Sequence, residues 1–128
     1  VSGHANPMGI GGELWRQGDR AFMGVTLGKA FEGAPGRAHG GVVAALIDET
    51  MGLVLFLHEL LAFTAQLDIT YKAPTPVGEP IVAEAWMASR DGRKLRLECT
   101  VRADETVIAT ATALFIAVDP SIFLTARQ

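Results

Sequence analysis

Residues 33–57 read GAPGRAHGGVVAALIDETMGLVLFL, and the rest of the chain is best understood around this stretch. A loop rich in glycine and proline leads into the His-Gly-Gly triplet at 39–41, where a long apolar segment begins. Its apolar residues cover nearly every face of a helix with about 3.6 residues per turn, which predicts a buried helix over residues 40–60. Inside that helix are two acids, Asp48 and Glu49.

An acid on a buried helix needs a partner or a chemical task, because an ionised carboxylate is costly to bury. Asp48 is therefore the leading catalytic candidate. At the start of the helix, the glycine pair leaves backbone N–H groups free at the positive end of the helix dipole. Gly40 is the candidate donor to a carbonyl oxygen that gains negative charge, and Gly41 would allow close approach. A tightly packed helix start is the plain alternative.

The spacing of these two groups adds a constraint. Gly40 and Asp48 are eight residues apart, which places them about 12 Å apart along an ideal helix and about 80° apart around it. One helix cannot easily present both groups to one reacting carbon. Two antiparallel copies can, so the spacing predicts a site shared across a two-fold homodimer. The sequence leaves open whether dimers pair further into a homotetramer.

On either side of the helix the apolar period is two, which indicates strands. Ala65, Leu67 and Tyr71 are expected on one face of a half-buried strand, and Asp91-Gly92 predicts a hairpin turn. One long helix and antiparallel strands joined by short turns indicate an α+β domain, in which a sheet of five to six strands wraps the helix. The expected strands are residues 13–16, 21–31, 65–71, 81–88, 95–103 and 106–117.

Composition limits the class of protein. A chain of 128 residues with 49% hydrophobic residues is expected to form a single domain, residues 1–128, with a substantial core. A net charge of -3 argues against a nucleic-acid partner. Cys99 is the only cysteine, so no internal disulfide forms and a reducing compartment is expected.

The sequence also sets an expectation for location. The first residues lack a basic patch followed by an apolar run, and the apolar run at 51–57 is far too short to span a bilayer. We therefore expect a cytoplasmic protein without a membrane partner.

The helical stretch resembles the signature of a known family. His39-Gly40-Gly41, then six mostly apolar residues, then an acid nine positions after the histidine are similar to the hotdog-fold acyl-CoA thioesterases. The similarity is greatest to the branch of the phenylacetyl-CoA and 4-hydroxybenzoyl-CoA thioesterases and their long-chain acyl-CoA relatives. Residues 3–10 resemble the family's Gly-x-x-Asn-Pro-x-Gly-Leu, residues 31–36 its Tyr/Phe-Glu-Gly-Pro-Pro-Gly, and residues 64–76 its strand ending in Tyr-x-x-Pro.

This resemblance implies a hotdog fold and hydrolysis of an acyl-CoA to a free acid and CoA. CoA is then part of the substrate, and no separate cofactor is expected. Asp48 would be the nucleophile on the thioester carbonyl or the general base for water, and the Gly40 N–H would polarise the carbonyl. Thr64, sixteen positions after Asp48, would help hold the water or the carboxylate. An ordinary hydroxyl at the start of a strand is an equal alternative for Thr64.

Other titratable residues of the stretch have plainer expected roles. For His39 we expect a hydrogen bond that holds the loop, with catalysis as the minor alternative. No metal site is expected, because His39 has no suitably spaced partner in His4 or His58. Glu49 is one position away from the motif, so an ion pair or a dimer contact is preferred to catalysis.

Contacts to the substrate are the least determined. CoA phosphates need cationic donors, although charges near turns are usually only solvated. The candidates are Lys72, Arg90, Arg93 and Lys94. An acyl pocket could draw on Met51, Phe56 and Trp86, which are otherwise core residues.

The sequence departs from the family pattern at one position. Gly33 stands where certain branches carry an asparagine, which moves the resemblance towards the branch with the Glu-Gly-Pro-Pro-Gly loop. A hydratase or dehydratase of acyl thioesters on the same fold is the second hypothesis, although its differently spaced His and acid are not found. A non-catalytic module that binds acyl-CoA or an aromatic ligand is the third. The acyl group stays open.

Overall fold

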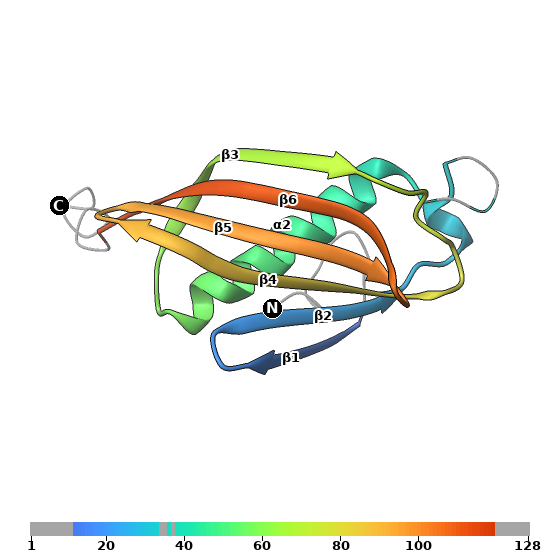
Figure 1. Ribbon diagram of the computed structural model, residues 1–128, viewed down its shortest axis with the longest axis horizontal. Coiled ribbons are helices and arrows are strands. Elements are labelled where there is room, and N and C mark those ends of the chain that lie inside the picture. The colour runs from blue at the N-terminus through green and yellow to red at the C-terminus, as the bar shows by residue number, and fades with distance from the viewer. Residues whose placement is uncertain (1–11, 34–35, 37, 120–128) are drawn as a thin grey trace, which may run out of the picture.

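In the computed structural model, one long helix crosses one face of a six-stranded antiparallel sheet (Figure 1). The structure describes residues 12–33, 36 and 38–119. A short 3-10 turn, η1 (Lys29–Phe31), precedes the helix α2 (Gly40–Leu57). The strands are β1 (Glu13–Gln17), β2 (Arg20–Thr26), β3 (Ala62–Tyr71), β4 (Pro80–Asp91), β5 (Lys94–Ala103) and β6 (Thr106–Ala117). This arrangement confirms the α+β architecture expected from the sequence.

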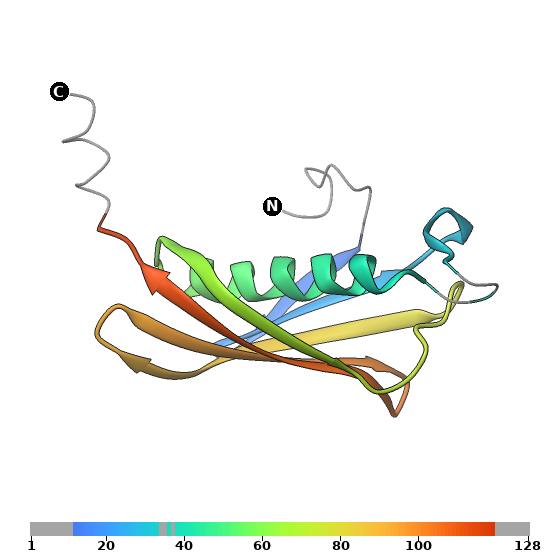
Figure 2. The same cartoon turned by 90° about the horizontal axis from the view of Figure 1, so that it is seen from above.

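The strand order does not follow the chain. The sheet runs β1-β2-β4-β5-β6-β3, so β3, which follows α2 directly, pairs with the last strand and forms an edge. Figure 2 shows the sheet curving around α2, which lies on its concave side. Because β3 has a neighbour on one side only, its other edge presents unpaired backbone groups.

The core lies between α2 and the concave face of the sheet. Strand residues that face α2 alternate with residues on the outer face, as in Leu95, Leu97 and Cys99 of β5, which are all fully or nearly fully buried. The helix contributes a stripe of side chains at helical spacing. The buried helix residues are Val42, Val43, Leu46, Ile47, Thr50, Met51, Val54 and Leu55.

The sequence predicted a helix buried on nearly every side, and in the single chain this expectation is wrong. Gly41, Asp48, Gly52 and Phe56 are exposed, and 71% of the Phe56 surface is open. A single sheet can cover only one side of a helix, so the remaining apolar residues stay open in one chain. By length and mean hydropathy α2 could cross a membrane, but its buried side packs into the core of this domain. In the residues described, α2 acts as a core helix.

Some element ends differ from expectation. The helix ends at Leu57 rather than near residue 60, because Glu59 adopts a left-handed conformation (φ 55°). The Leu60 N–H then bonds back to the Leu55 carbonyl at 3.0 Å, which closes the helix without a glycine. The strand expected over 21–31 ends at Thr26, where the chain leaves the sheet and forms η1. Residues 3–10, which include His4, lie outside the described residues.

Candidate active site

Asp48 and Thr64 meet on the open side of α2. The Thr64 hydroxyl donates to Asp48 Oδ1 at 3.4 Å, a long hydrogen bond that orients the carboxylate more than it stabilises it. Both residues are exposed in the single chain. The structure therefore brings together the two side chains expected sixteen positions apart, and leaves Asp48 Oδ2 without a hydrogen-bond partner among the described residues.

A β-bulge makes this contact possible. Thr64 pairs with Phe115 and Gln66 with Leu114, so Ala65 is an extra residue in β3. Strict alternation would put Thr64 on the outer face with Gln66, away from the helix. The bulge turns Thr64 to the face of buried Phe115, towards α2. Ala65 itself has no partner in the ladder, so the expected alternation is interrupted at this residue.

The N-terminal end of α2, where the glycine pair lies, is held by backbone contacts. The His39 N–H donates to the Phe31 carbonyl at 3.0 Å, and the His39 carbonyl accepts from the Val42 N–H at 3.0 Å. In a planar trans peptide the Gly40 N–H points opposite to the His39 carbonyl, hence outward from the helix end. Neither the Gly40 nor the Gly41 N–H has a partner among the described residues. Both are open to an acceptor.

Tyr71, at the end of β3, also touches this entrance. Its hydroxyl donates to the Gly40 carbonyl at 2.6 Å. A Cβ added at Gly40 would lie 3.3 Å from the Tyr71 hydroxyl oxygen, so the glycine lets the ring approach closely. The Tyr-x-x-Pro pattern in the sequence indicates no role for Tyr71, because the periodicity of β3 does not show which part of the helix lies beside it.

The loop before α2 is built around His39 and Glu32. The His39 ring lies over Gly33, where an added Cβ would be 2.9 Å from His39 Nδ1, so an asparagine there would displace the ring. The expected holding role of His39 falls to its backbone, because its side chain makes no capping hydrogen bond. Glu32, unassigned from sequence, accepts the Gly36 N–H at 2.8 Å and holds the loop.

Glu49 points to a different side of α2 from Asp48. It is half-buried, and burial raises the pKa of its carboxyl above the usual 4.5, with the Asp48 charge raising it further. No ion pair of Glu49 is present within the described residues. The ion pair expected for Glu49 is therefore not found there.

The four candidate cations fall at two ends of the sheet. Lys72 directly follows Tyr71 and so lies near Gly40. Arg90 lines a hollow with His58, near the C-terminal end of α2. Arg93 and Lys94 lie at the hairpin between β4 and β5, as Arg90 does, and this hairpin is beside the C-terminal end of β6. Within one chain these side chains do not surround one phosphate group.

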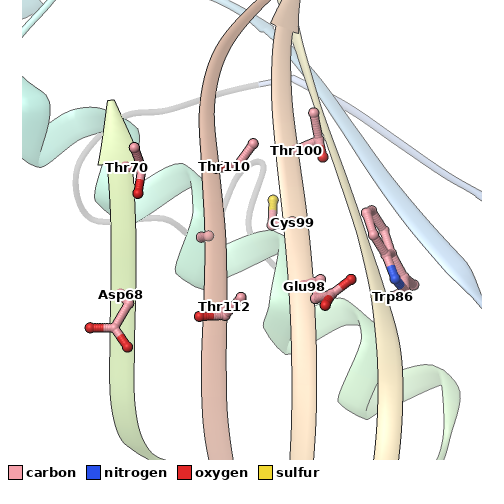
Figure 3. A pocket seen from close by; sticks show the side chains of 9 residues that line it. Asp68, Thr70, Trp86, Glu98, Cys99, Thr100, Thr110 and Thr112 are labelled. Carbon is pink, nitrogen blue, oxygen red and sulfur yellow. The ribbon is translucent and has the colours of Figure 1, made fainter. Parts of the chain in front are cut away.

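The candidate pocket residues also separate. Met51 has no exposed surface and packs in the core, whereas Phe56 is open to solvent. Trp86 lies on the outer face of the sheet, where a shallow hollow collects mainly threonine and acidic side chains (Figure 3). Asp48 is on the opposite side of the sheet, so Trp86 cannot share a pocket with it in one chain.

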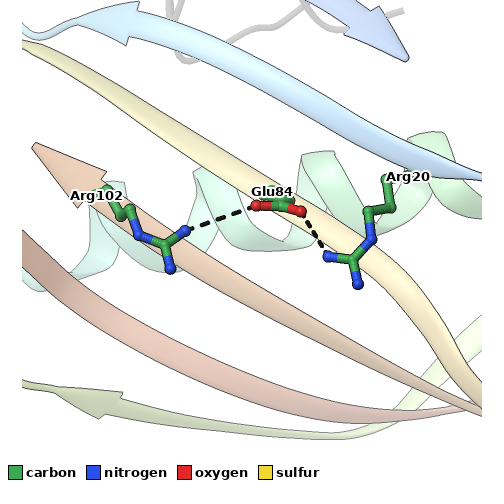
Figure 4. Close-up of polar contacts among 3 residues, drawn as sticks. All are labelled: Arg20, Glu84 and Arg102. Atoms are coloured by element: carbon green, nitrogen blue, oxygen red, sulfur yellow. Dashed lines mark hydrogen bonds and ion pairs between the residues drawn. The ribbon is translucent and has the colours of Figure 1, made fainter. Parts of the chain in front are cut away.

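The outer face has its own polar cluster (Figure 4). Glu84 lies between two arginines, with Arg20 Nη1 at 2.5 Å and Arg102 Nη1 at 3.6 Å. The Arg20 guanidinium also stacks 4.3 Å from the centre of the Trp86 ring. Exposed ion pairs of this kind contribute little stability. Among the described residues no group of three or more His, Cys, Asp or Glu side chains could hold a metal ion.

Comparison with known proteins connects this arrangement to a family. The family model described as the thioesterase superfamily matches residues 35–110. The acyl-coenzyme A thioesterase THEM4 of Mus musculus is 41% identical over 100 residues, a match that covers 77% of this chain and 43% of the mouse protein. The chain thus spans less than half the length of that relative.

Solved structures share the fold. A thioesterase superfamily protein is 35% identical, with a TM-score of 0.74 over 77% of this chain and 49% of that chain. A hypothetical thioesterase protein from Streptococcus pneumoniae, solved with coenzyme A, is 17% identical with a TM-score of 0.78, over 83% of this chain and 87% of that one. The helix wrapped by its sheet is therefore the hotdog fold expected from the resemblance.

Proposed function

This chain belongs to the thioesterase superfamily, and from that premise we propose that it hydrolyses an acyl-CoA thioester to the free acid and CoA. The observation that carries the proposal is the contact between Asp48 and Thr64 on the open side of α2. The name of the mouse relative, an acyl-coenzyme A thioesterase, supports the same substrate class, as does the coenzyme A solved with the streptococcal protein.

Asp48 is the proposed reacting group. Thr64 engages Oδ1 of its carboxylate, so Oδ2 is left to attack the thioester carbonyl or to take a proton from an attacking water. In either route the carbonyl oxygen gains negative charge, which the outward N–H of Gly40 stabilises. The C–S bond then breaks, the CoA thiolate leaves and takes up a proton, and the acid is released after water has been added.

Asp48 and Gly40 come from different chains in this proposal. Asp48 contacts Thr64 near one end of β3, and Gly40 contacts Tyr71 at the other end. If two β3 edges pair antiparallel with Thr64 opposite the partner's Tyr71, then Asp48 lies towards the partner's Gly40. Directly opposite residues share a face of the sheet, and the Ala65 bulge gives Thr64 and Tyr71 the same face. A homodimer through β3 therefore assembles two sites.

The contacts with CoA follow from this pairing. Lys72 lies beside the glycine entrance, so we assign it first to the CoA phosphates. Arg90, Arg93 and Lys94 lie at the end of the sheet where β3 begins, so in an antiparallel dimer they approach a site from the chain that supplies Asp48, and Lys72 approaches it from the chain that supplies Gly40. The protein is then expected to work in the cytoplasm as a dimer or a dimer of dimers, without a separate cofactor.

The test is release of free CoA from a panel of acyl-CoAs, detected with a thiol reagent. The assay has little background, because the only cysteine, Cys99, is buried and burial raises the pKa of its thiol to about 12. We expect turnover in the parent and a loss of at least about 10³-fold in Asp48→Ala. A fully active Asp48→Ala protein would contradict the proposal.

A matched control is Asp68→Ala, which removes a carboxylate from the outer face of the neighbouring strand. It should keep full activity. Water addition to an enoyl-CoA, followed by absorbance, tests the hydratase alternative on the same protein. Saturable binding of acyl-CoA without turnover of any substrate would favour the binding module.

A further inference from the structure

Tyr71 contacts the backbone of the glycine pair, and we propose that it is a positioning residue for thioester hydrolysis. Its hydroxyl fixes the Gly40 carbonyl, so that the Gly41 N–H of the same peptide stays directed outward beside the Gly40 N–H, towards the thioester oxygen. This inference rests on the proposed function, because that proposal places the glycine pair against the thioester oxygen. Tyr71 itself does not touch the reacting atoms.

The contact is short and specific. The distance of 2.6 Å between the Tyr71 hydroxyl oxygen and the Gly40 carbonyl oxygen is at the short end for O–H···O hydrogen bonds. A Cβ at Gly40 would lie 3.3 to 3.6 Å from three atoms of the Tyr71 side chain. The shortest of these distances, 3.3 Å, is tighter than most contacts that real Cβ atoms make. A residue with a side chain at position 40 would therefore shift the tyrosine by a few tenths of an ångström.

The anchor adds to the helical hydrogen bonds that hold the glycine pair at the start of α2. Glycine has more backbone freedom than any other residue, so two in succession can turn their N–H groups away from a substrate. In a planar trans peptide, fixing the carbonyl also fixes the N–H that points the opposite way. The His39 carbonyl is fixed by the Val42 N–H, which directs the Gly40 N–H. Tyr71 fixes the next carbonyl, which directs the Gly41 N–H.

The bond also changes the donor strength of the peptide. A hydrogen bond to a carbonyl polarises its amide, which strengthens the N–H on the other side. The hydroxyl carries its proton near neutral pH, and burial raises the pKa of Tyr71 above its usual 10.0. Since 48% of the Tyr71 surface is exposed, the residue is not a core side chain that packing alone explains.

The experiment uses Tyr71→Phe, which keeps the ring and removes only the hydroxyl. We expect kcat to fall roughly 10-fold, the loss of about one hydrogen bond's contribution, with KM within about twofold of the parent. Thr70→Val is the matched control, because it removes a hydroxyl from the neighbouring residue on the outer face. It should leave kcat unchanged. An unchanged kcat in Tyr71→Phe overturns the inference.

A second measurement separates positioning from general structural support. Nitrogen-15 relaxation should give lower order parameters for the Gly40 and Gly41 amides in Tyr71→Phe, while the rest of α2 keeps those of the parent. If the parent hydrolyses no acyl-CoA, the proposed function fails, and unchanged order parameters then overturn the role of Tyr71 as well. Lower order parameters in a Tyr71→Phe protein with the kcat of the parent would also overturn the role of Tyr71, because the positioning would then not matter for hydrolysis.

Discussion

The two long sides of α2 differ in what they contact. The side facing the sheet is closed, with Val43, Ile47 and Met51 at 0% exposure. The other side carries Gly41, Asp48 and Phe56, all exposed in one chain. Ile47 and Asp48 are adjacent in sequence, yet one belongs to the core and the other to the proposed site. The closed side holds the fold together, and the open side is available for chemistry and for assembly.

The largest effect on folding is expected at Ile47. Ile47→Ala removes a fully buried side chain and leaves a cavity, so the free energy of unfolding should fall by about 3 kcal/mol. Urea denaturation measures this change in the free energy of unfolding. Asp48→Ala, one residue away on the open side, should change the free energy of unfolding by less than about 0.5 kcal/mol. Equal losses in the two variants would remove the distinction between the sides.

A smaller effect, on activity alone, is expected at Thr64. Thr64→Val removes the hydroxyl that orients Asp48, so kcat should fall roughly 10-fold, as expected for a hydrogen bond to a charged group. Thr64 is exposed, so thermal unfolding should stay as in the parent. Thr64→Ser keeps a hydroxyl at the same position and should retain most of the activity. A Thr64→Ser protein as slow as Thr64→Val would show that the hydroxyl is not the active feature.

Glu49 lies between the two sides, and its effect should depend on pH. Burial raises the pKa of Glu49 in the folded chain above the unfolded value of 4.5, so the folded state binds this proton more tightly. The resulting stability is fully present below pH 4.5 and is lost as pH rises through the folded pKa. Glu49→Gln should therefore be more stable than the parent near neutral pH, and equally stable at low pH.

Denaturation curves across that pH range test the sign. Glu105→Gln, an exposed change in the turn between β5 and β6, is the control and should not alter the pH dependence. A parent that gains stability with rising pH relative to Glu49→Gln would contradict the expected direction.

The smallest effect is expected at Phe56. Its side chain is 71% exposed, so Phe56→Ser should change the free energy of unfolding by no more than about 0.5 kcal/mol in the isolated domain. Val54→Ala, two residues earlier on the closed side, should cost clearly more. A large loss in Phe56→Ser would show that another copy of the chain covers this part of α2.

The sequence by itself determined the local features. The His-Gly-Gly entrance to the apolar segment placed the helix start at Gly40, and the last strand was expected at residues 106–117, both as observed. The His-Gly-Gly triplet and Asp48 pointed to the thioesterase superfamily, which the family match confirms. These features depend on neighbours within about one helical turn or a few strand residues, so the order of residue types carries them.

Only the tertiary structure decided how distant residues meet. The pairing of β3 with β6 placed the edge strand beside α2, and the extra residue Ala65 turned Thr64 towards Asp48. The same pairing brought Tyr71 to Gly40 and separated Lys72 from the hairpin arginines. Strand order and register depend on contacts between segments far apart in the chain. A single inserted residue reverses the facing of a side chain, and local periodicity does not show it.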